Sequence, residues 1–195
     1  MKKKLVTIAS AILCTLLAEA ATKPVIHWSH LHNPVLSYSD WSIKDFAVAQ
    51  QDNQFYVFFS AFYQDNGQLR RHVVEITTRD FKTFSKPIMN FDGEESGYVG
   101  MCSPDVQKIG DIWELSFNSW GDNAKHLQHQ LFYMTSPDLI HWSPRHPFAE
   151  NLTAGEGADD LTVTRIGNQY YAMWKEPVIP HGLPRTVAVE KSQTP

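Results

Sequence analysis

The sequence contains very little cysteine: two residues in 195, Cys14 and Cys102. Cys14 lies in an N-terminal segment that we expect to be removed, so Cys102 would be left alone and no intrachain disulfide could form. A lone cysteine between Met101 and Ser103 is more typical of a small buried apolar side chain than of a reactive thiol. The fold must therefore be stabilised by packing and hydrogen bonds.

Runs of basic residues and helical periodicity are also scarce. The 17 Lys and Arg residues are outnumbered by 21 Asp and Glu, which gives a net charge of -4, and no basic run follows the first four residues. This charge pattern excludes the electrostatic footprint of a nucleic-acid-binding surface. No segment shows the apolar spacing of an amphipathic helix, so we do not expect a helical domain.

The first 20 residues have the organisation of a secretory signal peptide. A positive segment, 1–4, precedes an apolar run, 5–17, and the small-x-small sequence Ala18-Glu19-Ala20 follows. An apolar run of about 13 residues is too short to span a bilayer. We expect cleavage after Ala20, a mature domain over 21–195 with no membrane partner, and a secreted or periplasmic location.

What the chain has in abundance is aromatic residues, with 6 Trp, 7 Tyr and 11 Phe, and many of them fall in a repeated hairpin pattern. Each copy consists of a short apolar strand, a polar turn and an aromatic-rich second strand. Ten residues before the first aromatic of each hairpin stand Asp45, Ser103 and Asp160 respectively. The middle copy thus carries a serine where the outer copies carry an aspartate.

A second repeated element lies between the hairpins. Thr78-Arg79-Asp80-Phe81-Lys82-Thr83-Phe84-Ser85 matches Ser136-Pro137-Asp138-Leu139-Ile140-His141-Trp142-Ser143 in hydroxyl, Asp, apolar, aromatic and Ser positions, all in register. A third strand precedes each turn, and the segment that ends at Pro87 or Pro147 is suited to an outer strand. Later, 185–192 has the pattern of a further strand of the third copy.

A repeat of about 55 to 60 residues with four short strands is typical of a β-propeller blade. A β-sandwich also has many short strands, but it does not repeat a hairpin and a turn in register. We therefore predict an all-β fold with β-propeller architecture, of which about three blades are present in residues 21–195.

These motifs together resemble the five-bladed β-propeller glycoside hydrolases, above all family 43 and its arabinofuranosidase and xylosidase relatives. The resemblance covers about residues 24–192. It is carried by the Asp45 hairpin, the stretch Ser103-Pro104-Asp105-Val106, the turn at 136–142 and the Asp160 hairpin that ends in Trp174-Lys175-Glu176.

The resemblance implies inverting hydrolysis of O-glycosidic bonds in arabinose- or xylose-containing glycans. By position, Asp45 is similar to the general base of the family and Asp160 to the residue that modulates the pKa of the acid. An inverting enzyme needs one ionised carboxylate to activate water and one protonated carboxyl group opposite. Two alternatives stay open: both aspartates could only cap turns, and Asp159 could take the place of Asp160.

The same resemblance implies a general acid, a glutamate one blade further on. The blade spacing predicts it near position 215 to 220, whereas the sequence runs to Pro195 and its late glutamates, Glu176 and Glu190, do not begin an innermost strand. Three blades also leave a five-bladed ring open. We therefore expect the acid to be missing here and the chain to be C-terminally truncated, a fragment, or completed by association.

The remaining candidate residues concern the substrate. Phe46, Trp120 and Trp174 are candidates for stacking on a sugar ring, although a core role is the more common one for any of them. Lys175 is a candidate for contact with substrate or a carboxylate. Asp105 is a candidate for a turn-stabilising or channel-edge position and not for proton transfer. His27, His30 and His32 have no matching carboxylate spacing, so we predict no metal ligands.

We expect an oligo- or polysaccharide partner and no cofactor, with a channel cation such as calcium left open. The alternative functions are a non-catalytic carbohydrate-binding propeller and an inactive remnant. The sugar, the linkage and the endo or exo mode do not follow from the sequence.

Overall fold

A computed structural model of the protein describes residues 32–92, 98, 100–120, 130–153, 157–175 and 187–192. The chain divides into two units, Met1–Pro34 and Val35–Pro195, and all the elements described below lie in the second unit. The signal peptide predicted for residues 1–20 lies outside the described residues and stays a prediction. Within the described ranges, no helix has the length and apolar character needed to cross a membrane.

The first sheet is an antiparallel meander of four strands: β1 (Ser42–Gln51), β2 (Gln54–Asp65), β3 (Gln68–Thr78) and β4 (Met89–Phe91). Its two hairpin turns use residues that tolerate a left-handed backbone. Asp52 and Asn53 join β1 to β2 with φ of 49° and 66°, and Asn66 and Gly67 join β2 to β3 with φ of 49° and 77°. Positive φ at both central residues matches the twist of the flanking strands.

The second sheet repeats the first with the strands β5 (Gly100–Ile109), β6 (Ile112–Trp120), β7 (Leu131–Ser136) and β8 (His146–Pro147). The short helix α2 (Glu150–Thr153) follows it. The third sheet consists of β9 (Asp159–Ile166), β10 (Gln169–Lys175) and β11 (Val187–Ser192), also antiparallel.

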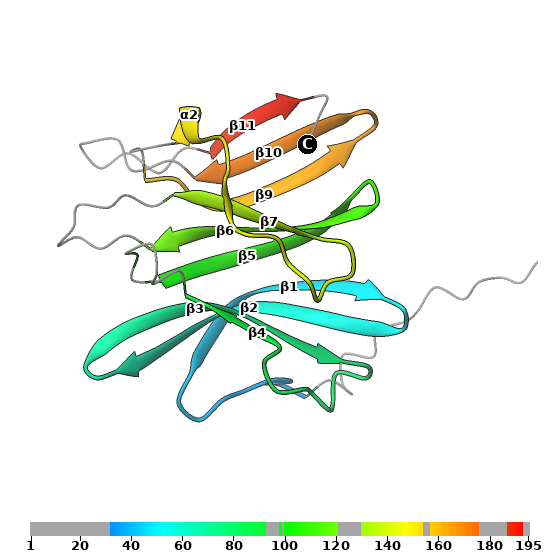
Figure 1. The fold of residues 1–195 in the computed structure, drawn as a ribbon. Helices are drawn as coiled ribbons and strands as arrows, with labels where there is room; N and C mark the ends of the chain where they lie inside the picture. The colour runs from blue at the N-terminus through cyan, green and yellow to red at the C-terminus, as the bar shows by residue number, and fades with distance from the viewer. Residues whose placement is uncertain are drawn as a thin grey trace, which may run out of the picture. The chain divides into compact units, whose positions relative to one another are not determined.

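The three sheets follow one another as consecutive blades, each built as a meander (Figure 1). The fold is all-β and is that of a partial β-propeller, which confirms the predicted fold class. The strand predicted over 185–192 is present as β11, paired with β10. The number of blades in a complete ring stays a prediction.

The first two blades meet at a single parallel bridge between Arg71 of β3 and Gly100 of β5. A Cβ atom at position 100 would collide with the backbone oxygen of Arg71. Glycine is therefore required there by the close approach of the two backbones.

The repeated turns after the third strands have the same hydrogen bonds in both copies. Asp80 Oδ1 accepts the backbone N–H groups of Lys82 and Thr83, both at 2.8 Å. Asp138 Oδ1 likewise accepts those of Ile140 at 3.0 Å and His141 at 2.8 Å. These bonds confirm the match between the two turns. The outer strand of the first blade begins two residues after Pro87, later than the sequence predicted.

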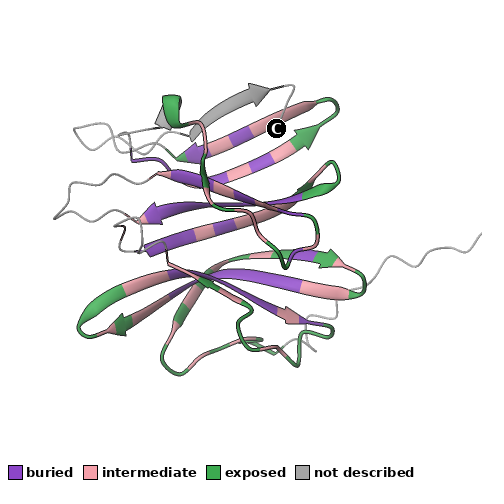
Figure 2. Ribbon diagram, viewed as in Figure 1, coloured by how far each residue is buried: buried purple, intermediate pink, exposed green. Residues whose placement is uncertain are grey.

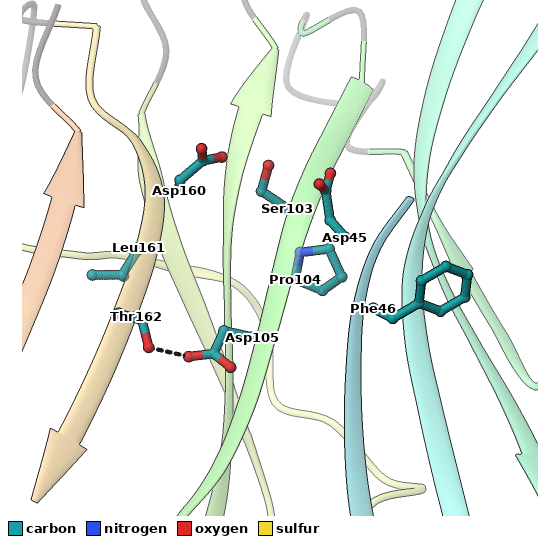
Figure 3. A pocket seen from close by; sticks show the side chains of 8 residues that line it. All are labelled: Asp45, Phe46, Ser103, Pro104, Asp105, Asp160, Leu161 and Thr162. Atoms are coloured by element: carbon teal, nitrogen blue, oxygen red, sulfur yellow. Dashed lines mark hydrogen bonds between the residues drawn. The ribbon is translucent and has the colours of Figure 1, made fainter. Parts of the chain in front are cut away.

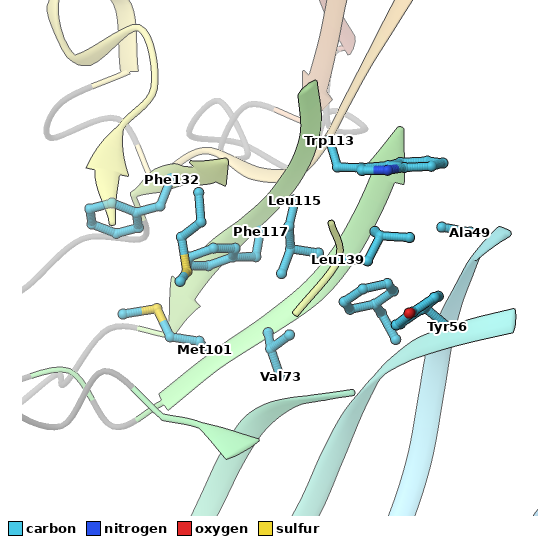
Figure 4. Close-up of a cluster of buried hydrophobic side chains, with 11 residues drawn as sticks. Ala49, Tyr56, Val73, Met101, Trp113, Leu115, Phe117, Phe132 and Leu139 are labelled. Carbon is cyan, nitrogen blue, oxygen red and sulfur yellow. The ribbon is translucent and has the colours of Figure 1, made fainter. Parts of the chain in front are cut away.

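Most of the buried residues lie within the strands, whereas the turns and strand ends are mostly exposed (Figure 2). One core cluster combines residues of the first and second blades (Figure 4) and includes Phe58, Leu115 and Phe117. A second combines the second and third blades around Leu131 and Leu161. Cys102 is buried as predicted, and burial raises the pKa of its thiol to about 11, so the thiol is protonated and unreactive at neutral pH.

Candidate active site

The three residues that stand ten positions before the hairpin aromatics have the same backbone conformation. Asp45, Ser103 and Asp160 have φ of 56°, 56° and 54° on the first strands of their blades. Strand register is interrupted at each of these places, between Lys44 and Ala47 in the first blade and at matching positions in the other two. Such bulges re-aim a side chain out of the regular alternation of a strand. The repeat seen in the sequence is thus a repeated bulge.

These three bulges lie around one open pocket of about 290 Å³. The side chains of Asp45, Ser103 and Asp160 stand at the same level of their strands (Figure 3). All eight lining residues come from the first strands of the three blades: Asp45, Phe46, Ser103, Pro104, Asp105, Asp160, Leu161 and Thr162. The two outer aspartates, which are far apart in the chain, therefore line one pocket in the fold.

Two polar residues of the second strands hold the bulges of neighbouring blades together. Ser60 Oγ donates to Asp45 Oδ2 at 2.9 Å and accepts the backbone N–H of Ser103, in the next blade, at 2.8 Å. Asn118 Oδ1 accepts the backbone N–H of Asp160, again in the next blade, at 3.2 Å. Each side chain therefore satisfies a backbone donor that the bulge removes from the strand ladder.

The two aspartates differ in their cationic neighbours. Lys44 Nζ lies 3.0 Å from Asp45 Oδ2, and both side chains are partly exposed. Lys175 Nζ pairs with Asp160 Oδ2. Lys175 follows Asp160 at the same spacing in the sequence as Ser60 follows Asp45 and Asn118 follows Ser103. The sequence predicted that Lys175 contacts either the substrate or a carboxylate, and in the structure it contacts the carboxylate of Asp160.

A further carboxylate lies one step along the same strands. Asp105 Oδ2 accepts a hydrogen bond from Thr162 Oγ1 of the third blade. Ser116 Oγ donates towards the backbone oxygen of Leu161, also in the third blade, at 3.3 Å. Asp105 therefore lines the pocket, as predicted for a residue of the channel edge, while it bridges two blades.

The three predicted stacking residues lie in different places. Phe46 lines the pocket and is 53% exposed, and its ring is also 5.7 Å from that of Phe59. Trp120 is not among the lining residues, and its ring instead covers the Arg71 guanidinium at 4.3 Å. Trp174 is 3% exposed and packs in the second core cluster, which is the alternative to a sugar contact that the sequence left open.

Asp159 and the histidines are the other residues that the sequence left open. Asp159 is buried at the start of β9, whereas Asp160 faces the pocket. His27 and His30 lie outside the described residues, and His32 is exposed. In the ranges that the structure describes, no three His, Cys, Asp or Glu side chains are grouped so that they could hold a metal ion.

Three residues that contact the site were not predicted from the sequence: Ser60, Asn118 and Thr162. A signal for the first two was present, because both follow a bulge position at the same spacing, and the third copy has Lys175 there. Their partners lie in the next blade, so their role follows only from the arrangement of the blades.

No family model matches the chain, and no curated protein sequence matches it. Solved structures do match. A family 32 β-fructofuranosidase of Bombyx mori shares 10% identity at a TM-score of 0.58, over 79% of this chain and 34% of the other. GH43B of the Bacteroides ovatus xyloglucan PUL shares 19% identity at a TM-score of 0.51, over 80% and 28%. A β-1,2-mannobiose phosphorylase of Listeria innocua shares 11% identity at a TM-score of 0.53, over 80% and 57%.

These likenesses, at 10–19% identity, concern the fold. The chain spans 28–57% of the length of these three structures. By name, the β-fructofuranosidase and the mannobiose phosphorylase differ in the sugar and in the reaction.

Proposed function

We propose that the pocket at the bulges is the glycone-binding and water-activating part of an inverting glycosidase site, with Asp45 as general base. The observation that carries the proposal is the convergence of three repeated bulges on one open pocket with a carboxylate on each outer blade. The propeller-type fold shared with glycoside hydrolases supports the same class of reaction.

In this proposal, Asp45 takes a proton from a water molecule while the oxygen of that water forms a bond to the anomeric carbon. The bond from the anomeric carbon to the leaving oxygen breaks on the opposite face, so the anomeric configuration inverts. Ser60 acts as a positioning residue because its hydroxyl fixes one oxygen of the Asp45 carboxylate. The other oxygen, Oδ1, is then available to the water.

Asp160 is assigned the role of modulating the pKa of the general acid and orienting the sugar. Its partner Lys175 holds one of its oxygens and balances its charge within the pocket. The leaving oxygen needs a proton from a further carboxyl group, since the described residues of the pocket include no glutamate. We propose that this acid belongs to the next blade, as the resemblance to family 43 implies.

The substrate class that we propose is an arabinose- or xylose-containing glycan. The exposed ring of Phe46 at the edge of the pocket offers an apolar surface to the C–H face of a sugar. Secretion directed by residues 1–20 belongs to the same proposal, since such polymers lie outside the cell.

Glycosyl fluorides test this proposal, because fluoride leaves without a proton and a general acid is therefore not needed. We expect the chain to hydrolyse an arabinofuranosyl or xylopyranosyl fluoride faster than buffer, with inversion seen by NMR of the first-formed sugar. Asp45→Asn should lose at least about 100-fold of that rate, as is typical of a lost general base. Asp52→Asn is the matched control, because it removes an exposed carboxylate from the turn at the other end of β1.

Hydrolysis that is equal in Asp45→Asn and the wild type, or that retains configuration, would refute the assignment. The alternative, a carbohydrate-binding propeller without catalysis, predicts sugar binding with no fluoride release. An inactive remnant predicts neither binding nor release. The ion pair of Asp160 with Lys175 is the observation that favours the binding alternative, because it offsets one negative charge at the pocket.

A further inference from the structure

The junction between the first two blades has a buried carboxylate that meets an indole. Glu75 on β3 is 1% exposed and faces the second blade. The turn at 136–143 of the second blade inserts Leu139 and Trp142 into this junction. Trp142 Nε1 donates to Glu75 Oε2 at 3.1 Å, and its ring packs edge-on against Phe58 at 5.8 Å. The third strand of one blade thus receives an aromatic donor from the turn of the next.

The junction between the second and third blades has the same two residue types in exchanged positions. When the first two blades are aligned through their repeated turns, Tyr56 and Glu75 correspond to Glu114 and Tyr133. Glu114 on β6 is 8% exposed, and its Oε1 atom has no hydrogen-bond partner among the residues that the structure describes. Burial, together with the charge of Asp105, raises the pKa of Glu114 to about 7. A buried acceptor without a partner lowers the free energy of unfolding, so a hydrogen-bond donor beside it would be stabilising.

A cavity of about 390 Å³ lies beside this carboxylate. Its other lining residues are aromatic, small or able to accept hydrogen bonds: Tyr133, Thr135, Pro147, Phe148 and Ala149. The second junction therefore keeps an acceptor and has room for a ring.

The register of β11 against β10 indicates which position of the third blade would carry such a ring. Ser192 of β11 pairs with Tyr170, just as Thr78 pairs with Phe55 and Ser136 pairs with Trp113. Ser192 thus has the register of the residue that begins the repeated turn. Trp142 follows Ser136 by six residues, so the equivalent ring would stand six residues after the register position of Ser192.

We propose that the Glu114 cavity is a docking socket for an aromatic N–H donor, carried by a polypeptide segment that continues the third blade at the β11 position. Glu114 accepts the hydrogen of that donor, as Glu75 accepts the hydrogen of Trp142. The partner is therefore a blade-type turn with an indole side chain six residues after its first hydroxyl residue. This inference concerns the junction and is independent of the glycosidase proposal.

Indole compounds test the socket in the full chain. 5-Fluoroindole and its 1-methyl derivative have similar rings, but only the first can donate a hydrogen bond. Titration followed by ¹⁹F NMR should show wild-type protein binding 5-fluoroindole about tenfold or more tightly than the methylated compound. Glu114→Leu should retain the fold and lose this preference, because no acceptor remains. Ile112→Leu, on the exposed start of the same strand, serves as the control variant.

A second variant calibrates the test at the first junction. Trp142→Ala removes the indole that satisfies Glu75, and it should create an additional site with the same preference for the N–H compound. Equal affinity for both compounds, or no binding by the wild type, would overturn the proposal.

Discussion

Replacing Glu75 by glutamine should make the stability of the protein much less dependent on pH. Burial, the main cause, and the charge of Asp138 raise the pKa of Glu75 from 4.5 to about 8, although the hydrogen bond from Trp142 acts in the opposite direction. Only Oε2 has a partner among the described residues, and Oε1 is buried without one. The folded protein therefore favours the protonated carboxyl group, while the unfolded chain ionises it at ordinary acidity.

The sign and size of the effect follow from proton linkage. Between pH 4.5 and about 8, the folded state holds a proton that the unfolded state has released, so stability falls as pH rises. Each pH unit in this window costs about 1.4 kcal/mol, and the whole window costs up to about 5 kcal/mol. Glu75→Gln keeps an acceptor for Trp142 and has no proton to lose. The variant should thus be several kcal/mol more stable than the wild type at high pH.

Urea unfolding of both proteins at pH 4.5 and pH 8.5 measures this difference. The two proteins share all other titratable groups. The pH dependence of the difference between their unfolding free energies therefore reports the titration of Glu75. Glu75→Leu should lose the same pH dependence, but should be less stable than the glutamine variant because the Trp142 N–H is left unpaired. If the difference between wild type and Glu75→Gln is the same at both pH values, within the error of the measurement, the reasoning is refuted.

The other predictions concern contacts between and within the blades. Asn118→Ala should lower the unfolding free energy by about 1 to 3 kcal/mol, because the buried N–H of Asp160 loses its acceptor, and an unchanged urea midpoint would contradict the contact. Asp138→Asn should reduce stability above pH 4 and leave it unchanged in strong acid, since its bonds from His141 and the turn backbone lower the carboxyl pKa in the folded state. Identical acid-unfolding curves would show that these bonds contribute nothing. Lys175→Met should weaken sugar binding at the pocket without lowering the melting temperature, as measured by titration calorimetry and thermal scans, whereas unchanged affinity would separate Lys175 from the site.

The sequence predicted the fold well because its signals are local. Aromatic and β-branched runs predicted the strands of each hairpin, and polar turn residues such as Asp52-Asn53 marked where they reverse. The ten-residue offset placed Asp45, Ser103 and Asp160 at equivalent bulges. All of these signals act within one blade, where residues close in sequence are also close in space.

The contacts between blades were not predictable in the same way. Ser60 and Asn118 bond to residues 43 and 42 positions further along the chain, and no local pattern marks such partners. Trp174 had two possible places, the sugar site or the core, and the packing against the second blade shows the core. The partner of Glu75 is the indole of Trp142, 67 positions further along the chain in the next blade.

The central claim is that the pocket at the three bulges binds a sugar. Saturation-transfer NMR with arabinan- and xylan-derived oligosaccharides tests it most directly, with wild type, Asp45→Ala and Asp160→Ala compared at equal concentration. We predict saturation of the sugar protons by the wild type, a clear loss in both aspartate variants, and no loss in Glu114→Leu, whose change lies at the other cavity. Equal saturation in all four proteins, or none in the wild type, would contradict the assignment of this pocket.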